Sequence, residues 1–333
     1  MLHVPCCFSD LRLNASLQSS LASSLRNAPE NTFIVPYRPA SSPQYEEAAS
    51  ACQVALLPAL YEVENMVKTL ILTPLCKALN RRVGAAIGKM HEGTYFEESL
   101  DAMDGTGTSF VQKHLMSLYD TIAQEHLSSL PLEYAAMVAS TVATYSMYNF
   151  VSNVSLIRPL REVSRLHITQ DLADFELALE QLVFKAGRSL TLSQVEQGKP
   201  YAELRAVRQM LFWAGLDDTT AAANSLAKTI MSEAWAKDVR PSIVCHFLFS
   251  FAPSLLSSPH HFKHMRPEAY VSELVRLDGS IDDGEVSAWM TTMACCDSYQ
   301  QRESVGGSVL DGDGRVAAVV MILGPELLRR RRH

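Results

Sequence analysis

The sequence lacks the patterns of a secreted or disulfide-bonded protein. Its seven cysteines are an odd number, and none belongs to a C-x-x-C pair. Disulfide frameworks are typical of small secreted domains, whereas 333 residues with 47% hydrophobic content can bury a sizeable core. The N-terminus, MLHVPCCFSD, has neither the basic nor the long apolar segment of a secretory signal. We therefore expect a cytosolic chain.

Long hydrophobic runs and a positive charge excess are also missing. The longest apolar run, PSIVCHFLFSFAPSLL at 241–256, is interrupted by Pro253 and is shorter than the about 20 residues of a membrane-spanning helix. The net charge is −7, and four of the 29 basic residues form the terminal run Arg329–Arg332. We expect no basic stripe on the body of the protein. This charge balance is not typical of nucleic-acid binding or of broad adhesion to anionic lipid.

Glycine and proline number only 15 each, while leucine, alanine, glutamate and other helix formers recur. This composition predicts an all-α protein. We expect a disordered or weakly ordered segment over 1–43, which is rich in Ser, Asn and Pro, and a helical-bundle region over 44–302. Residues 303–333 are expected to be a poorly structured tail ending in the basic run. No repeat of fixed period is present, so a regular helical solenoid is not indicated.

The clearest helical pattern lies between residues 155 and 212. One stripe at alternating spacings of four and three predicts a buried helix face, with Asp171, Asp174, Glu176 and Glu180 mostly on other faces. The stripe comprises Ile168, Leu172, Phe175, Leu179, Leu182 and Ala186. The apolar stretch 132–151 is expected to be central, and Pro74 is expected to kink or end an earlier helix. Further helices are expected over 201–213, 219–236, 259–275 and 283–301.

Two segments resemble nucleotide or calcium loops, but neither has the required residues. Gly84-Ala-Ala-Ile-Gly88-Lys89 has three residues between its glycines where a phosphate loop has four, and Met90 replaces the magnesium-binding Ser or Thr. We interpret it as a helix with small residues. Asp278 to Glu285 resembles the second half of a calcium loop, but Leu274 and Arg276 would occupy its first two ligand positions. An acidic turn is the better interpretation.

A metal site is the remaining candidate for chemistry. His260 and His264 are spaced as zinc ligands on a helix, with His261 beside them, but the Glu of the H-E-x-x-H pattern is missing. Partly exposed histidines in a first helical turn are the simpler interpretation. No G-x-S-x-G or G-x-G-x-x-G pattern occurs. We therefore assign no catalytic, cofactor-binding or metal-binding residue.

Two blocks of the sequence resemble a known family. The first contains Ser-Leu-Ile-Arg-Pro-Leu at 155–160, Arg165-Leu166, Asp171-Leu172-Ala173 and the run 176–179. The second contains Leu-Arg-Ala-Val-Arg at 204–208, followed by Leu211-Phe212, with Gln209 where the family would have proline. In order and spacing they resemble subunit five of the conserved oligomeric Golgi complex, and a looser helical resemblance extends from about 45 to 275.

The resemblance implies an elongated array of consecutive helical bundles, as in the helical rods of tethering complexes. It implies a non-catalytic structural subunit that acts in retrograde transport of vesicles within the Golgi. The expected partners are subunit seven most directly, with subunits six and eight in the same lobe, on the cytosolic face of the Golgi membrane as a peripheral protein. Family members are longer, so the chain is expected to correspond to their C-terminal part.

Two other functions remain open on the sequence alone. One is an all-helical, metal-dependent enzyme that uses His260 and His264, and the other is a generic cytosolic helical adaptor. For an adaptor or a tethering subunit, the aromatic residues Phe212, Trp213 and Trp289 are candidate interface anchors, since aromatics dominate binding hot spots. Burial of each in the core is the alternative.

Overall fold

The computed structural model describes residues 57–59, 61–92, 95, 108–158, 160–187, 199–215, 222–252 and 312–331. Every regular element among these residues is helical, which confirms the predicted all-α class. The elongated array of bundles stays a prediction. The weakly ordered segment 1–43, the acidic turn 278–285 and the helices expected over 259–275 and 283–301 lie outside the described residues.

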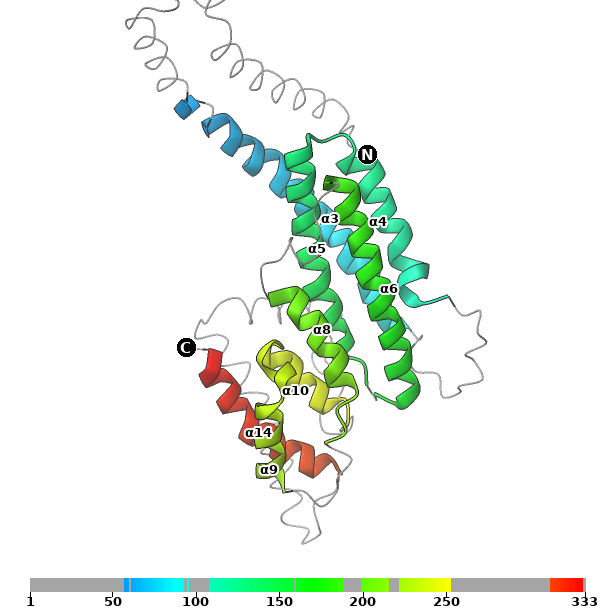
Figure 1. The fold of residues 1–333 in the computed structure, drawn as a ribbon, viewed down its shortest axis with the longest axis vertical. Coiled ribbons are helices and arrows are strands. Elements are labelled where there is room, and N and C mark those ends of the chain that lie inside the picture. Colours follow the sequence, from blue (N-terminus) through cyan, green and yellow to red (C-terminus); the bar gives the residue numbers. More distant parts are fainter. Residues whose placement is uncertain are drawn as a thin grey trace, which may run out of the picture.

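Four roughly parallel helical columns form the upper part of the molecule in Figure 1. The first contains η3 (Lys68–Leu72), α3 (Thr73–Gly88) and the 3₁₀ turn η4 (Lys89–Glu92). The second contains the π-helix η6 (Gln112–Met116), α4 (Ser117–Thr121) and the π-helix η7 (Ile122–Leu127). The other two are α5 (Leu132–Ser155) and α6 (Glu162–Gly187).

Helix α5 is the centre of this arrangement, as predicted for 132–151. It contacts α3, α6, α8 and α10, and its second half is buried almost all round. A helix that is buried on all sides requires neighbours on all sides, and α5 has them. Phe150 of α5 stacks on Phe175 of α6 with ring centroids 4.2 Å apart. All six residues of the predicted α6 stripe are buried in the same core, which confirms that prediction.

The first column does not end at Pro74. Proline has no N–H to donate and its ring collides with the carbonyl of residue i−4 in a regular α-helix. The chain avoids this by forming the π-helix η3 directly before the proline, which then occupies the first turn of α3. The N–H of Thr73 donates to the carbonyl of Lys68, and its hydroxyl donates to the same oxygen over 2.9 Å. The helix therefore continues through the site.

The lower part of the molecule packs shorter helices below α5 (Figure 1). These are α8 (Lys199–Leu211), α9 (Ala223–Ser232), the 3₁₀ turn η8 (Ala234–Lys237), α10 (Pro241–Phe249) and α14 (Gly312–Arg331). All but the first residue of α10 are buried. The helix predicted over 201–213 is confirmed, whereas the helix predicted over 219–236 is divided at Glu233 between α9 and η8.

The expectation of a poorly structured tail is wrong for Gly312–Arg331. This segment is helix α14, and it packs against α9 and α10. Its apolar run follows a helical spacing that buries one broad face. The glycines before this run led to the prediction of a poorly structured tail. The buried hydrophobic residues of α14 are Val316, Ala317, Val319, Val320, Leu323 and Leu327.

Candidate functional site

A buried ion pair with several hydrogen bonds lies between α8 and the start of α10. Nε of Arg240 donates to both carboxylate oxygens of Glu203, each 2.9 Å away, and the backbone N–H of Arg240 donates to Oε1 over 2.8 Å. The two side chains are only 12% and 2% exposed. Nη2 of Arg240 also donates to the carbonyl of Tyr148 and to the hydroxyl of Ser152, both on α5. The pair therefore joins three helices.

A second buried carboxylate joins α6 to the start of the second column. Asp171 accepts hydrogen bonds from the hydroxyl of Tyr95 and from the backbone N–H of Val111, the latter over 3.2 Å. The N–H of Val111 is one of the unpaired donors of a helix start, so Asp171 acts as a cap supplied by another helix. Burial raises the pKa of Asp171, although the hydrogen bond from Tyr95 lowers it in part. Burial and then Asp171 raise the pKa of Tyr95 well above 10.

A buried histidine contacts an arginine where α5 ends. Nη2 of Arg158 donates to Nδ1 of His246 over 2.7 Å, and its guanidinium lies 5.6 Å from the ring centroid of Phe249. Burial, and secondly the positive charge of Arg158, lower the pKa of His246 well below 6.5. The imidazole is therefore neutral at pH 7 and accepts the hydrogen bond.

The phosphate-loop-like segment is part of α3, as interpreted from the sequence, and its glycine allows a close helix contact. A Cβ atom at Gly84 would lie 2.6 Å from Oη of Tyr145 on α5. Beside this contact, Asn149 donates to the Tyr145 hydroxyl over 3.1 Å, and Asn153 donates to Oδ1 of Asn149 over 2.9 Å. Nε2 of His91 completes the chain by donating to Asn153 over 2.9 Å. These side chains bind one another along the α3–α5 contact.

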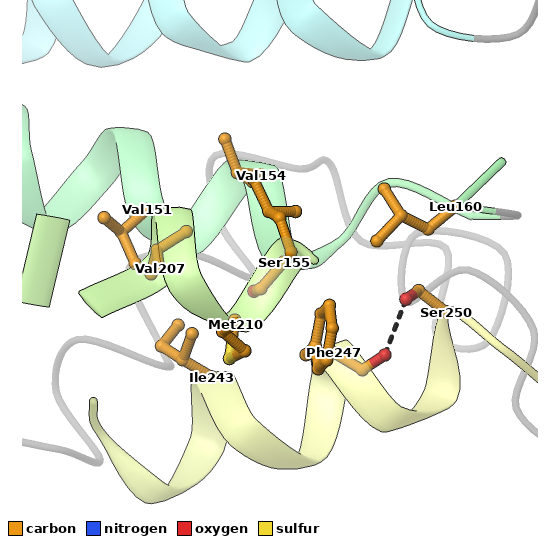
Figure 2. Close-up of a pocket in the computed structure, with 10 residues that line it drawn as sticks. Val151, Val154, Ser155, Leu160, Val207, Met210, Ile243, Phe247 and Ser250 are labelled. Atoms are coloured by element: carbon orange, nitrogen blue, oxygen red, sulfur yellow. Dashed lines mark hydrogen bonds between the residues drawn. The ribbon is translucent and has the colours of Figure 1, made fainter. Parts of the chain in front are cut away.

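The cavities of the described residues do not gather reactive groups. The one in Figure 2 has a volume of about 10 Å³, room for about one water, between α5, α8 and α10. Its walls are mainly apolar, and the hydroxyl of Ser250 donates to the carbonyl of Phe247 instead of pointing free. A groove of about 550 Å³ between α9 and α14 is lined by apolar residues such as Ala227, Met231 and Ile322 and by the charged residues Lys228 and Glu326.

The metal candidates His260, His261 and His264 lie outside the described residues. Within the described ranges, no three His, Cys, Asp or Glu side chains are grouped so that they could hold a metal ion. Nor is any helix there long and apolar enough to cross a membrane. Of the candidate anchors, Phe212 is 51% exposed, Trp213 packs edge-on against Trp235, and Trp289 lies outside the described residues.

Sequence reasoning missed the three residues that matter most in these clusters. Asp171 was expected mostly off the buried face of its helix but is 2% exposed. Glu203 and Arg240 carried no signal, because their pairing depends on how α8 and α10 meet. Asp171 lies three residues after Ile168 and four before Phe175 of the buried stripe, and these spacings, which share a helix face, were an available indication.

Each polar cluster described above joins one helix to another. The described residues therefore define an all-helical protein whose polar clusters serve the packing of its helices. Two curated proteins match the chain. Conserved oligomeric Golgi complex subunit 5 of Arabidopsis thaliana is 28% identical over 239 residues, which cover 68% of this chain and 25% of that protein. The protein of the same name from Mus musculus is 24% identical over 214 residues, which cover 63% of this chain and 23% of that protein.

The chain is thus similar in sequence to subunit five of the conserved oligomeric Golgi complex, the resemblance that the two sequence blocks indicated. The matched region spans about a quarter of the length of the curated relatives. No protein-family model matches the chain, and no solved structure matches it.

Proposed function

We propose that the chain is a non-catalytic structural subunit of a Golgi vesicle-tethering complex and acts in retrograde transport within the Golgi. The observation that carries this proposal is the match, over about two thirds of the chain, to two proteins named as subunit five of that complex. Its proposed place is the cytosolic face of the Golgi membrane, held there as a peripheral protein through the other subunits.

The proposed partners are the other subunits of the same complex. Subunit seven is the most direct partner, and subunits six and eight share its lobe. The described structure supports such a role because its buried polar groups hold helices in fixed positions, as a scaffold requires. Binding would then be spread over helix faces instead of being concentrated in a pocket.

The direct test is to purify the tagged full chain from its own cells under mild conditions and to identify what accompanies it. We expect subunit seven in a stable complex, with subunits six and eight in smaller or salt-sensitive amounts. As a control, Lys237→Glu on the exposed surface of η8 should retain these partners. Recovery of the chain without any subunit of the complex would refute the proposal.

The two alternatives give different results in the same preparation. A metal-dependent enzyme that uses His260 and His264 would contain zinc or iron in stoichiometric amount, which elemental analysis measures. A generic helical adaptor would be recovered with proteins of another assembly.

A further inference from the structure

The outer face of α3 carries positive charge in a protein whose net charge is −7. Four exposed cations, Lys77, Arg81, Arg82 and Lys89, lie on this face and are named here the α3 basic stripe. No Asp or Glu occurs in the sequence between Glu64 and Glu92. The expectation that the body of the protein has no basic stripe is therefore wrong, because the net charge averages away a local excess.

The stripe is not neutralised by the parts of the chain that the structure describes. Ion pairs there join Lys68 to Glu64, Lys185 to Asp120 and Arg208 to Glu176, as well as the two pairs at Arg240 and Arg329, and none includes a residue of the stripe. Arg82 does contact another side chain: its Nη1 lies 3.5 Å from Nε2 of His126. Burial and the charge of Arg82 lower the pKa of His126, so this neighbour is neutral at pH 7 and leaves the charge of Arg82 in place.

Two exposed alanines run along the middle of the stripe. Ala78 and Ala85 are seven residues apart, which places them on the same side of the helix two turns apart. At 100° per residue, Lys77 and Arg81 lie on one side of this line, and Arg82 and Lys89 lie on the other. Small side chains let a second helix approach closely, since the distance between packed helices depends on the residues at the contact. The face thus combines a narrow small-residue seam with cations along both edges.

We propose that the α3 basic stripe docks an acidic amphipathic helix of another protein. Small or apolar residues of that helix lie over Ala78 and Ala85, and its Asp and Glu side chains pair with the flanking cations. The stripe extends over 77–89, a length of about 18 Å at 1.5 Å per residue, which matches about three turns of a partner helix.

The composition of the face favours a helix over a lipid surface. Peripheral membrane helices insert bulky side chains such as Trp, Phe or Leu beside their cations. Between the cations of the stripe, the exposed side chains are alanines. Single exposed ion pairs contribute little, so the interaction depends on several pairs acting together and weakens as salt is raised.

Site-specific crosslinking identifies what covers the face. The full chain, expressed in its own cells, carries the photo-crosslinking residue p-benzoylphenylalanine in place of Lys89, at the end of the stripe, so that the alanine seam stays small. The control carries it in place of Ala173, an exposed alanine on α6. We expect the peptide crosslinked from position 89 to have Asp or Glu flanking small or apolar residues at spacings of three and four. Position 173 should not capture that peptide. A neutral or basic peptide, or no crosslinked protein at position 89, would overturn the inference.

Charge reversal tests whether the cations hold the partner. Lys77→Glu combined with Arg81→Glu should reduce the crosslinking yield at position 89 by about tenfold, since each replaced pair becomes a repulsion. The control Lys228→Glu with Lys237→Glu, which reverses two exposed charges on α9 and η8, should leave the yield unchanged. An unchanged yield in the α3 variant would also overturn the inference.

Sedimentation with vesicles separates the lipid alternative. Vesicles containing about 30% phosphatidylserine present the surface charge that attracts polybasic segments. We expect the charge-reversed chain and the unmodified chain to sediment with them equally. Sedimentation that is lost on charge reversal would assign the stripe to anionic lipid and refute the docked helix. The inference does not depend on the proposed tethering role, since an acidic partner helix from any assembly would support it. The absence of any such partner would refute it even if the tethering role is correct.

Discussion

Charged side chains inside the bundle and those on the outer face of α3 are in opposite situations. Inside, Glu203 and Arg240 are nearly sealed from solvent and each charge has a partner at hydrogen-bond distance. On α3, Lys77, Arg81 and Lys89 are exposed and have no ion-pair partner in the part of the chain that the structure describes.

The difference shows which charges serve the fold. A buried charge that loses its partner keeps the cost of leaving water, whereas an exposed charge is solvated whether or not it is paired. Substitutions should therefore divide sharply, with large losses of stability inside the bundle and almost none on the α3 basic stripe.

The largest loss is expected from Glu203→Ala, which leaves Arg240 buried without its carboxylate. Removing one partner of a buried pair costs about 3–5 kcal/mol of unfolding free energy. Urea unfolding followed by circular dichroism measures it. Replacing both residues, Glu203→Leu with Arg240→Met, should restore most of the loss because no buried charge remains. A loss below about 1 kcal/mol for Glu203→Ala would place this pair among ordinary surface pairs.

Asp171→Ala should cost about 2–3 kcal/mol, because the hydroxyl of Tyr95 and the N–H of Val111 both lose a buried acceptor. The matched control is Asp174→Ala on the same helix, where the carboxylate accepts only an exposed hydrogen bond from Gln112 in the described structure. We expect the control to change the unfolding free energy by less than about 0.5 kcal/mol. Equal losses in the two variants would contradict the capping role of Asp171.

Gly84→Ala tests the close α3–α5 contact and should cost about 1–2 kcal/mol, since the added methyl collides with the hydroxyl of Tyr145. In a Tyr145→Phe background that hydroxyl is gone. There the same substitution should be neutral or stabilising, because alanine favours helix over glycine by about 1 kcal/mol. The coupling between the two sites in a double-mutant cycle is the measurement, and independent effects would contradict the contact.

The fourth expected effect is on pH dependence. The pKa of His246 is lower in the folded protein than the 6.5 of a free histidine, so the unfolded chain takes up the proton first as the pH falls. The contribution of His246 to stability is complete above pH about 6.5 and falls by about 1.4 kcal/mol per pH unit below it. Unfolding between pH 7.5 and 5.5 measures the slope. In His246→Gln this part of the slope should disappear, whatever the variant costs at pH 7.5.

The smallest effect is expected from Lys77→Glu combined with Arg81→Glu. Both cations are exposed and unpaired in the described structure, so their reversal should leave the urea midpoint unchanged within error. A clear destabilisation would show that the stripe serves the fold and would remove the contrast between the two regions.

Much of the helical core was predictable because it depends on local spacing. The stripe from Ile168 to Ala186 repeats at the helical period and is buried, and the second half of the apolar helix α5 is buried almost all round. The segment from Gly84 to Lys89 was correctly interpreted as a helix, since it lacks the spacing and the Ser or Thr of a phosphate loop. Local patterns of this kind do not depend on the rest of the chain.

The candidate polar clusters were not predictable, because they depend on distant residues. Glu203 and Arg240 are 37 residues apart in sequence, and Asp171 lies 60 residues from the N–H that it caps. Nothing local distinguishes Glu203 from a solvated carboxylate. Helix α14 was missed for a related reason: its apolar run has neighbours to bury against only once α9 and α10 are in place.

The π-helix η3 before Pro74 changes the direction in which the side chains of the preceding helical residues point. A turn with i→i+5 hydrogen bonds contains one residue more than an α-helical turn, so it advances the angular position of the preceding side chains by about 100° relative to a continuous α-helix. Below η3, Leu79, Val83 and Ile87 point into the core, whereas above it Tyr61 and Met66 are exposed where the helix extends past the bundle (Figure 1). The one additional residue in the turn Lys68–Leu72 therefore rotates the helical residues before η3 relative to those after it. Its deletion would turn the upper section against the lower one without altering any side chain in either.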